Sequence, residues 1–348
     1  GGRWFEGEPA LQDRLARGVE QSVLEGIDLD AFHTGSRQFN GEWLFGTYLM
    51  AGLGYGQLAL QRPEWRTRAP ALMQRCIERM MEKPVREFDR VMWKGEDPLD
   101  HLDDGGDHAA YLGYFNVLLG LHRHLDPQSP FIALHDRISA RLRQRLEQSK
   151  WLLLESYPDE LYAVDNCAVL GGLGLHEKVT GAPPSPLLAR ALENLRTRAL
   201  DPKSGLLFQA TDPHTGQPID DPRGSGTTLG LYLLAHADRD LARALHQAVE
   251  RQLAGRFLGF GAVREYPKWI EGGDGDIDSG PIVMGFGVSP TGFHLAGDRE
   301  TFRHLYASAH FAGSPLDRGD RREYVTGGPL GNAILFAMVT APPEAVWP

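Results

Sequence analysis

The segment ELYAVDNCAVLGGLGLH, residues Glu160–His176, decides the fold because it is apolar on nearly every side of a helix. A helix that is hydrophobic all round must be buried on all sides. Each glycine costs about 1 kcal/mol relative to alanine inside a helix, so repeated glycines indicate that neighbouring backbones approach closely. The segment therefore predicts an inner helix that other helices enclose.

Five further segments share this apolar, glycine-rich character, and they begin near residues 42, 107, 224, 281 and 329. Between them lie charged, amphipathic segments such as PLLARALENLRTRAL, which are typical of helices with one solvated face. Periodicity predicts helices at about 8–26, 42–61, 64–82, 107–125, 131–153, 160–178, 185–200, 224–237, 238–253, 281–296, 298–312 and 329–341.

Inner and outer helices thus alternate, and the inner ones recur at a spacing of roughly 50 to 65 residues. The arrangement that buries every inner helix is an all-α (α/α)6 barrel, a six-hairpin toroid, formed as a single domain over residues 1–348. A helical solenoid is the alternative, but its repeats are more alike. The turn signals DPKSG and DPHTG predict a short β-hairpin or turn excursion near 201–222.

Composition excludes several classes of partner. The net charge of −10, with lysines and arginines scattered among acids, argues against nucleic acid. No apolar run reaches the roughly 18 residues that a membrane-spanning helix needs. Cys76 and Cys167 lack the spacing of a disulfide framework or zinc site. The sequence starts with Gly1 rather than methionine, which leaves an upstream signal or anchor open, and both cytoplasm and periplasm are compatible.

In an (α/α)6 barrel the segments leading into the inner helices emerge at one mouth, and here those segments are long. They collect aromatic rings, acids and an arginine, which is what a polyhydroxylated ligand uses. We expect a small-molecule or oligosaccharide substrate, and the candidate substrate-binding residues are Glu42, Trp43, Trp93, His108, Tyr111, Tyr162, Asn166, Arg223, Tyr266, Trp269, Asp276 and Tyr324.

Asp165 is the first candidate catalytic residue, since it is placed about a turn and a half inside a buried helix. A carboxylate there is costly unless it is paired or functional, and burial raises its pKa towards that of a general acid. Asp104 and Asp107 precede the second inner helix and are candidates too, although either could simply cap it. Arg223 could bind a carboxylate of the substrate or pair with Asp220 or Asp221.

The stretch EGGDGDIDSGPIVMGFG, residues 271–287, has three aspartates at alternate positions. An EF-hand loop needs glycine at its sixth position and glutamate at its twelfth, where DGDIDSGPIVMG has serine and glycine. We therefore interpret Asp278 as a catalytic or binding residue at the start of an inner helix. Histidines form no HxH or HExxH pattern, so no metal and no cofactor are predicted.

Short motifs resemble the unsaturated glucuronyl and rhamnogalacturonyl hydrolases. The similar pieces are Val164-Asp165-Asn166, the region 104–108, residues 201–206, and Arg223-Gly224-Ser225-Gly226. This resemblance implies an (α/α)6 fold and catalytic aspartates on inner helices, with Asn166 standing where the family has a second acid. A second resemblance, to the linalool dehydratase-isomerase group, implies acid-base chemistry on an isoprenoid alcohol.

Three functions follow from these patterns. The first is a metal-independent glycoside hydrolase or lyase in which Asp165 and a second carboxylate from Asp104, Asp107 or Asp278 act as acid and base. The second is a dehydratase or isomerase of a small apolar alcohol, which predicts a closed, mainly apolar cavity with Asp165, Tyr162 and His108 around one hydroxyl and Cys167 as a further candidate. The third is a glycan-binding protein without catalysis. The sequence determines neither the substrate nor the oligomeric state.

Overall fold

The computed structural model of the chain describes residues 9–270, 280–297 and 299–341. The chain divides into two compact units. The first consists of residues 1–88, 254–264 and 275–347, and the second of residues 89–253, 265–274 and 348. Each unit is described by itself, and the single domain over 1–348 stays a prediction.

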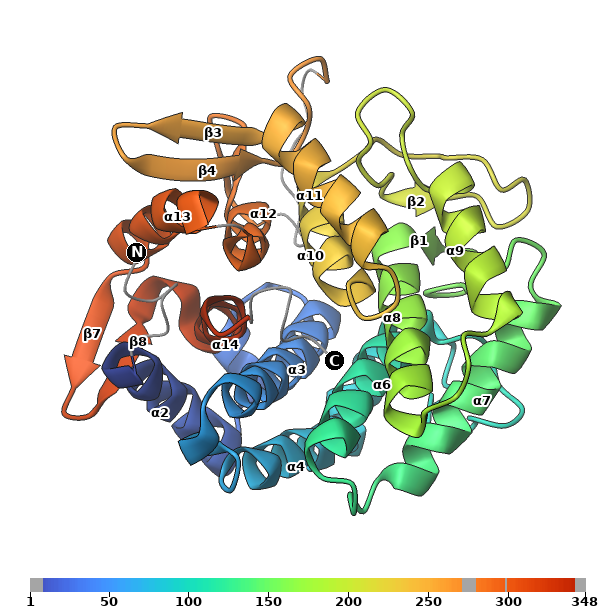
Figure 1. The fold of residues 1–348 in the computed structure, drawn as a ribbon, viewed down its shortest axis with the longest axis horizontal. Coiled ribbons are helices and arrows are strands. Elements are labelled where there is room, and N and C mark those ends of the chain that lie inside the picture. Colours follow the sequence, from blue (N-terminus) through green and yellow to red (C-terminus); the bar gives the residue numbers. More distant parts are fainter. Residues whose placement is uncertain (1–8, 271–279, 298, 342–348) are drawn as a thin grey trace. The chain divides into compact units, whose positions relative to one another are not determined.

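The second unit contains the predicted alternation of buried and amphipathic helices (Figure 1). The buried helices are α6 (Ala109–Leu125), α8 (Ala163–Thr180) and α10 (Gly224–Leu234). The amphipathic helices are α7 (Ile132–Gln148), α9 (Pro186–Arg198) and α11 (Arg239–Gln252), and each buries one face. These six helices confirm the prediction for this part of the sequence to within a few residues.

The three buried helices pack in parallel, with α8 between α6 and α10 (Figure 1). A Cβ atom at Gly113 of α6 would lie 2.9 Å from the backbone nitrogen of Val169, and one at Gly171 of α8 would lie 2.3 Å from the carbonyl oxygen of Leu233. Only glycine permits backbones this close. The glycines thus set the spacing of the helices, as their frequency in the sequence predicted.

The first unit is built around α3 (Arg37–Gln61) and α14 (Gly328–Val339), which lie side by side. Gly54 faces the ring of Phe336, and the Gln57 side chain donates to the carbonyl oxygen of Ala337 over 2.7 Å. The surrounding elements are α2 (Pro9–Glu25), η1 (Leu29–Phe32), η2 (Pro63–Trp65), α4 (Ala69–Met80), α13 (Arg299–Ala312) and η4 (Val325–Gly327).

The predicted inner helix at 281–296 is wrong in its first half. The chain instead forms β5 (Ile282–Val283), β6 (Phe286–Gly287), α12 (Val288–Phe293) and η3 (His294–Ala296). Met284 and Gly285 both have positive φ angles, 51° and 82°, which close a hairpin between the two strands. Because a right-handed helix needs a negative φ angle at every residue, the turn at Met284 and Gly285 is incompatible with a continuous helix over this segment.

Three further elements were not predicted. Helix α5 (Lys83–Met92) lies between the predicted helices at 64–82 and 107–125, where the sequence predicted no helix, and it begins in the first unit and ends in the second. The hairpin β3 (Ala254–Phe257) to β4 (Phe260–Arg264) joins β6 and β5 in a sheet of order β3-β4-β6-β5. A second hairpin pairs β7 (Pro315–Arg318) with β8 (Arg321–Tyr324).

The excursion predicted near 201–222 is present. It contains β2 (Ala210–Thr211), which pairs antiparallel with β1 (Leu161–Tyr162), and isolated bridges such as that between Phe208 and Pro222. Asp201 and Asp212 accept hydrogen bonds from backbone N–H groups two and three residues ahead, as turn aspartates do. Within the described ranges, no helix is long and apolar enough to cross a membrane.

Candidate functional site

Asp165 lies in the first turn of α8, not a turn and a half inside, because the helix begins at Ala163 rather than at residue 160. Its Oδ1 accepts a hydrogen bond from the Tyr114 hydroxyl over 2.7 Å, and its carboxyl is also bonded to the Ser156 side chain. Only 7% of the residue is exposed. Burial raises the pKa of Asp165, and the two hydrogen bonds offset this only in part.

His108 lies immediately before α6 with both ring nitrogens bound to carboxylates. Its Nδ1 lies 2.5 Å from Oδ2 of Asp89, and its Nε2 lies 3.0 Å from Oε1 of Glu96. The residue is fully buried and has a left-handed backbone, with φ 50° and ψ 38°. Such a conformation costs a non-glycine residue about 1–2 kcal/mol, so the surrounding contacts hold the ring in place.

The two carboxylates on His108 differ in their environment. Asp89 is fully buried, its Oδ1 has no hydrogen-bond partner among the described residues, and burial raises its pKa to about 6. The charge of Asp165 adds to this increase, so the two aspartates are neighbours. The Glu96 side chain is 34% exposed. Partial burial opposes its ionisation, yet hydrogen bonds from the Gly106 N–H and from His108 lower its pKa.

Trp93 contacts both His108, with its two carboxylates, and Ser156, which bonds Asp165. Its ring packs on His108 with ring centroids 4.4 Å apart, and its indole N–H donates to the carbonyl oxygen of Ser156 over 3.2 Å. Ser156 in turn bonds Asp165. A Cβ atom at Gly106 would lie 2.0 Å from the Trp93 ring, so the glycine allows the loop to cross it. We call Asp89, Trp93, Glu96, His108, Tyr114, Ser156 and Asp165 the carboxylate cluster.

The other acids predicted beside His108 have different environments. Asp104 is exposed, and its ion-pair partner is His101 at 3.5 Å. Asp107 accepts from the backbone N–H of Glu155 over 2.9 Å, which fastens the loop before α6 to the loop before α8. Arg145 holds the same loop through the carbonyl oxygens of Leu102, Gly105 and Asp107. Asp107 thus positions the carboxylate cluster from its edge.

Several predicted binding residues in this unit make structural contacts. Asn166 accepts from the N–H of Leu154 and donates to the carbonyl oxygens of Leu154 and Tyr162. Tyr111 is fully buried and packs against Phe115. The Tyr162 hydroxyl donates to Glu160 over 2.8 Å. These contacts order the helix starts that carry the carboxylate cluster.

Arg223 directly precedes α10 and pairs with Glu265, which the sequence did not indicate as its partner. Its Nε donates to Oε1 of Glu265 over 2.9 Å, and the Ser225 hydroxyl donates to the same oxygen over 2.6 Å. The guanidinium lies over the ring of Tyr266, 5.4 Å from its centroid. Trp269 is 41% exposed, with the Lys203 ammonium 4.0 Å from its ring centroid.

The remaining predicted site residues belong to the first unit. Glu42 and Trp43 lie near the start of α3, where Trp43 contacts Phe32 edge to face. Tyr324 is buried, and its hydroxyl lies 2.8 Å from that of Tyr306. Asp276 and Asp278 lie outside the described residues.

Sequence reasoning missed Asp89, Glu96 and Glu265 as members of these clusters. Asp89 lies on α5, which was predicted as loop, so no periodicity placed it on an inward face. Glu265 follows β4, which was also predicted as loop. The available signal was the sequence KPVREFDRVM, whose apolar Val85 and Phe88 are spaced as on one face of a helix, followed by Asp89.

Comparison with known proteins shows the fold. No family model and no curated protein match the sequence. A family 76 α-mannanase from Bacteroides thetaiotaomicron is similar over 98% of this chain and 97% of its own, with a TM-score of 0.51 and 13% identity. A polysaccharide lyase is similar over 94% and 97%, with a TM-score of 0.48 and 14% identity.

An unsaturated glucuronyl hydrolase from Streptococcus agalactiae is similar over 86% of this chain and 80% of its own, with a TM-score of 0.45 and 10% identity. The similarity to the mannanase extends over nearly the whole of both chains. The chain therefore has the (α/α)6 fold that the sequence predicted.

Proposed function

We propose that the chain is a carbohydrate-active enzyme that cleaves glycosidic bonds, with Asp165 as the general acid. The observation that carries this proposal is the contrast between two carboxyl groups of one cluster. Burial raises the pKa of Asp165, whereas hydrogen bonds lower that of Glu96 despite its partial burial. Two carboxyls whose pKa values are pushed apart are what acid and base roles require.

In this mechanism Asp165 protonates the departing glycosidic oxygen while Glu96 stays ionised. Glu96 either activates a water molecule or stabilises the positive charge that develops on the sugar ring. His108 and Asp89 are positioning residues, because His108 bonds Glu96 through Nε2 and is itself held by Asp89 through Nδ1. Removal of Asp89 would release the ring that orients Glu96.

The charges around the cluster favour a neutral glycan over a uronic acid. Asp89, Glu96, Asp107 and Asp165 all belong to this region, and the ionised members, Glu96 above all, repel a substrate carboxylate. The buried arginines nearby already bind protein groups: Arg145 bonds backbone carbonyls, and Arg223 bonds Glu265. The mannanase similar in fold is named for a neutral polysaccharide, which agrees with this substrate class.

The dehydratase alternative gains no support from the described contacts. It needs Asp165, Tyr162 and His108 around one substrate hydroxyl, with Cys167 as a further candidate. Instead Tyr162 bonds Glu160, and His108 binds two carboxylates. The Cys167 thiol is fully buried with a pKa raised by that burial, and it packs against Gly230.

A screen of substrates tests the proposal. The purified chain is incubated with α- and β-linked manno- and gluco-oligosaccharides, unsaturated glucuronides and terpenoid alcohols, and new reducing ends or dehydrated products are measured. We expect cleavage of a neutral oligosaccharide that Asp165→Asn lacks. Turnover of terpenoid alcohols alone, or cleavage that Asp165→Asn retains in full, would overturn the proposal.

A further inference from the structure

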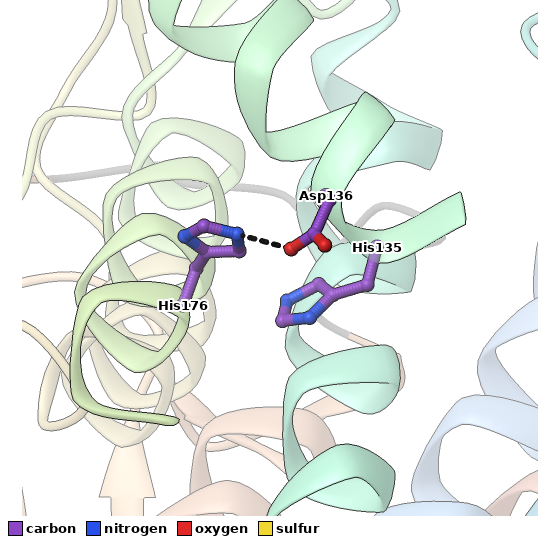
Figure 2. A group of neighbouring side chains, drawn as sticks. All are labelled: His135, Asp136 and His176. Atoms are coloured by element: carbon purple, nitrogen blue, oxygen red, sulfur yellow. Dashed lines mark hydrogen bonds and ion pairs between the residues drawn. The ribbon is translucent and has the colours of Figure 1, made fainter. Parts of the chain in front are cut away.

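The second unit contains a cluster of possible metal ligands in His135, Asp136 and His176 (Figure 2). His135 and Asp136 are adjacent in the first half of α7, and His176 lies near the end of α8. One donor atom from each residue lies within 4.8 Å of the others. Because His176 and Asp165 are eleven residues apart on one helix, the cluster is about 16 Å along α8 from Asp165.

His135 is the residue that calls for a ligand. It is fully buried, and neither of its ring nitrogens has a hydrogen-bond partner within the described part of the chain. Leaving a buried polar atom unbonded costs about 1–3 kcal/mol, and native structures resolve most such cases with water or an ion. Figure 2 shows the His135 ring next to the Asp136 carboxylate and facing His176. The centroids of the two imidazoles are 4.9 Å apart.

The distances suit a small divalent ion. Nε2 of His176 lies 2.9 Å from Oδ1 of Asp136. Two ligands at the tetrahedral angle around a zinc ion with bonds of about 2.1 Å are about 3.4 Å apart, so this pair of atoms would have to separate by about 0.5 Å to bind the ion. Two imidazoles and one carboxylate favour an ion of borderline softness such as Zn²⁺, because Mg²⁺ and Ca²⁺ prefer oxygen ligands throughout.

We propose that His135, Asp136 and His176 bind a transition-metal dication of the zinc class, with water in the remaining positions, and that the ion links α7 to α8. This site is independent of the proposed glycan cleavage. The sequence did not predict it because His176 is 40 residues from Asp136.

Neighbouring charged groups determine how the site binds. Arg123 donates to Asp136 Oδ1 over 2.5 Å, which is the outer support that ligating carboxylates commonly have. Arg143 donates to Nδ1 of His176 over 3.3 Å and lies 3.6 Å from Oε1 of Glu177, an atom without a hydrogen-bond partner. A metal ion at Nε2 would leave the His176 proton on Nδ1, and the guanidinium of Arg143 would then have the Glu177 carboxylate as its partner.

Both histidines are kept neutral, the form that binds metal. Burial lowers the pKa of His135 to about 3, and burial also lowers that of His176. The charges of Arg123 and Arg143 act in the same direction, and only Asp136 opposes them. Arg123 and His176 also keep the pKa of Asp136 low despite its partial burial.

The test is a metal titration of the full chain after treatment with a chelator. Zn²⁺ is titrated against a chromophoric competitor, and Co²⁺ is titrated while its visible absorption is recorded. The variants are His176→Gln and Asp136→Asn, and the control is His214→Gln, a histidine whose side chain is 77% exposed. Thermal unfolding with chelator present checks that every variant is folded.

We expect the wild type and His214→Gln to bind one ion per chain, with Co²⁺ absorption bands. Affinity should fall by at least about tenfold in His176→Gln and Asp136→Asn. Equal binding by the wild type and His176→Gln, or no binding by the wild type, would overturn the proposal.

Discussion

Replacement of Tyr114 by phenylalanine tests the environment of Asp165 without changing the shape of the core. The substitution removes the hydroxyl that donates to Oδ1 of Asp165 over 2.7 Å. A hydrogen bond to a charged group is worth about 1.5–3 kcal/mol, and one between neutral groups about 0.5–1.5 kcal/mol. The ionised form of Asp165 thus loses about 1.4 kcal/mol more than the protonated form, so its pKa should rise by about one unit.

The pKa of Asp165 determines how the effect of Tyr114→Phe on the free energy of unfolding depends on pH. Because burial already raises the pKa of Asp165, this group stabilises the fold below its unfolded pKa of 3.8 and loses that contribution as pH rises through the folded pKa. Tyr114→Phe should therefore be more destabilising at pH 8 than at pH 4, by about 1.4 kcal/mol. The alkaline limb of the kcat/KM profile should move up by about one unit.

Urea unfolding at the two pH values and the pH–rate profile measure these shifts. The control is Tyr55→Phe, which removes a buried hydroxyl that donates to the carbonyl oxygen of Ala16 over 3.0 Å, in the first unit. It should cost about the same free energy of unfolding at both pH values and leave the profile unchanged. If Tyr114→Phe behaves like this control, Tyr114 does not set the pKa of Asp165.

Three other substitutions follow from the contacts. Glu265→Gln should lower the free energy of unfolding by about 3–5 kcal/mol, because it removes the carboxylate charge from the buried pair with Arg223. Glu193→Gln, in an exposed pair, should change it by less than about 1 kcal/mol, and equal effects in urea unfolding would refute this. Gly171→Ala should lower the free energy of unfolding by about 1–3 kcal/mol, since its Cβ atom would lie 2.3 Å from the Leu233 carbonyl oxygen. Gly331→Ala is the control, because a Cβ atom there has nothing within 4 Å, and it should stabilise α14 by roughly 0.5–1 kcal/mol. A loss of stability at both positions in urea unfolding would contradict the packing argument. Glu96→Gln should reduce kcat by a factor of about 10²–10⁴. Glu155→Gln changes a nearby carboxylate outside the carboxylate cluster and should leave kcat within a few fold of the wild type. Similar losses of kcat for both variants in steady-state kinetics would show that Glu96 does not have its proposed role.

The fold could be predicted from the sequence because burial dictates composition along each helix. The segments of α6 and α8 have no polar face and contain glycines, and in the structure these glycines meet neighbouring helices closely. Local turn chemistry was harder to predict. The apolar run after Pro281 is compatible with either a helix or a strand. In the structure, positive φ angles at Met284 and Gly285 form the turn of a hairpin there.

The candidate site was predicted only in part, since a side chain's partners depend on elements distant in the sequence. Asp165 was identified because a carboxylate in an apolar helix needs an explanation, and it is indeed buried and hydrogen-bonded. Its neighbour Asp89 lies on the short helix α5, whose many charged residues obscure the apolar pattern by which a helix is predicted. His108 was expected to face a ligand, yet two carboxylates bind its ring. No sequence spacing reveals such pairings.

The central claim is that Asp165 is the proton donor for glycosidic bond cleavage, and leaving-group dependence tests it most directly. A departing sugar needs protonation, whereas a nitrophenolate departs without it. On the oligosaccharide found in the screen, Asp165→Asn should lower kcat/KM by about 10²–10⁴. On the nitrophenyl glycoside of the same sugar it should lose less than about tenfold. Equal losses on both substrates, or no loss on the oligosaccharide, would contradict the claim.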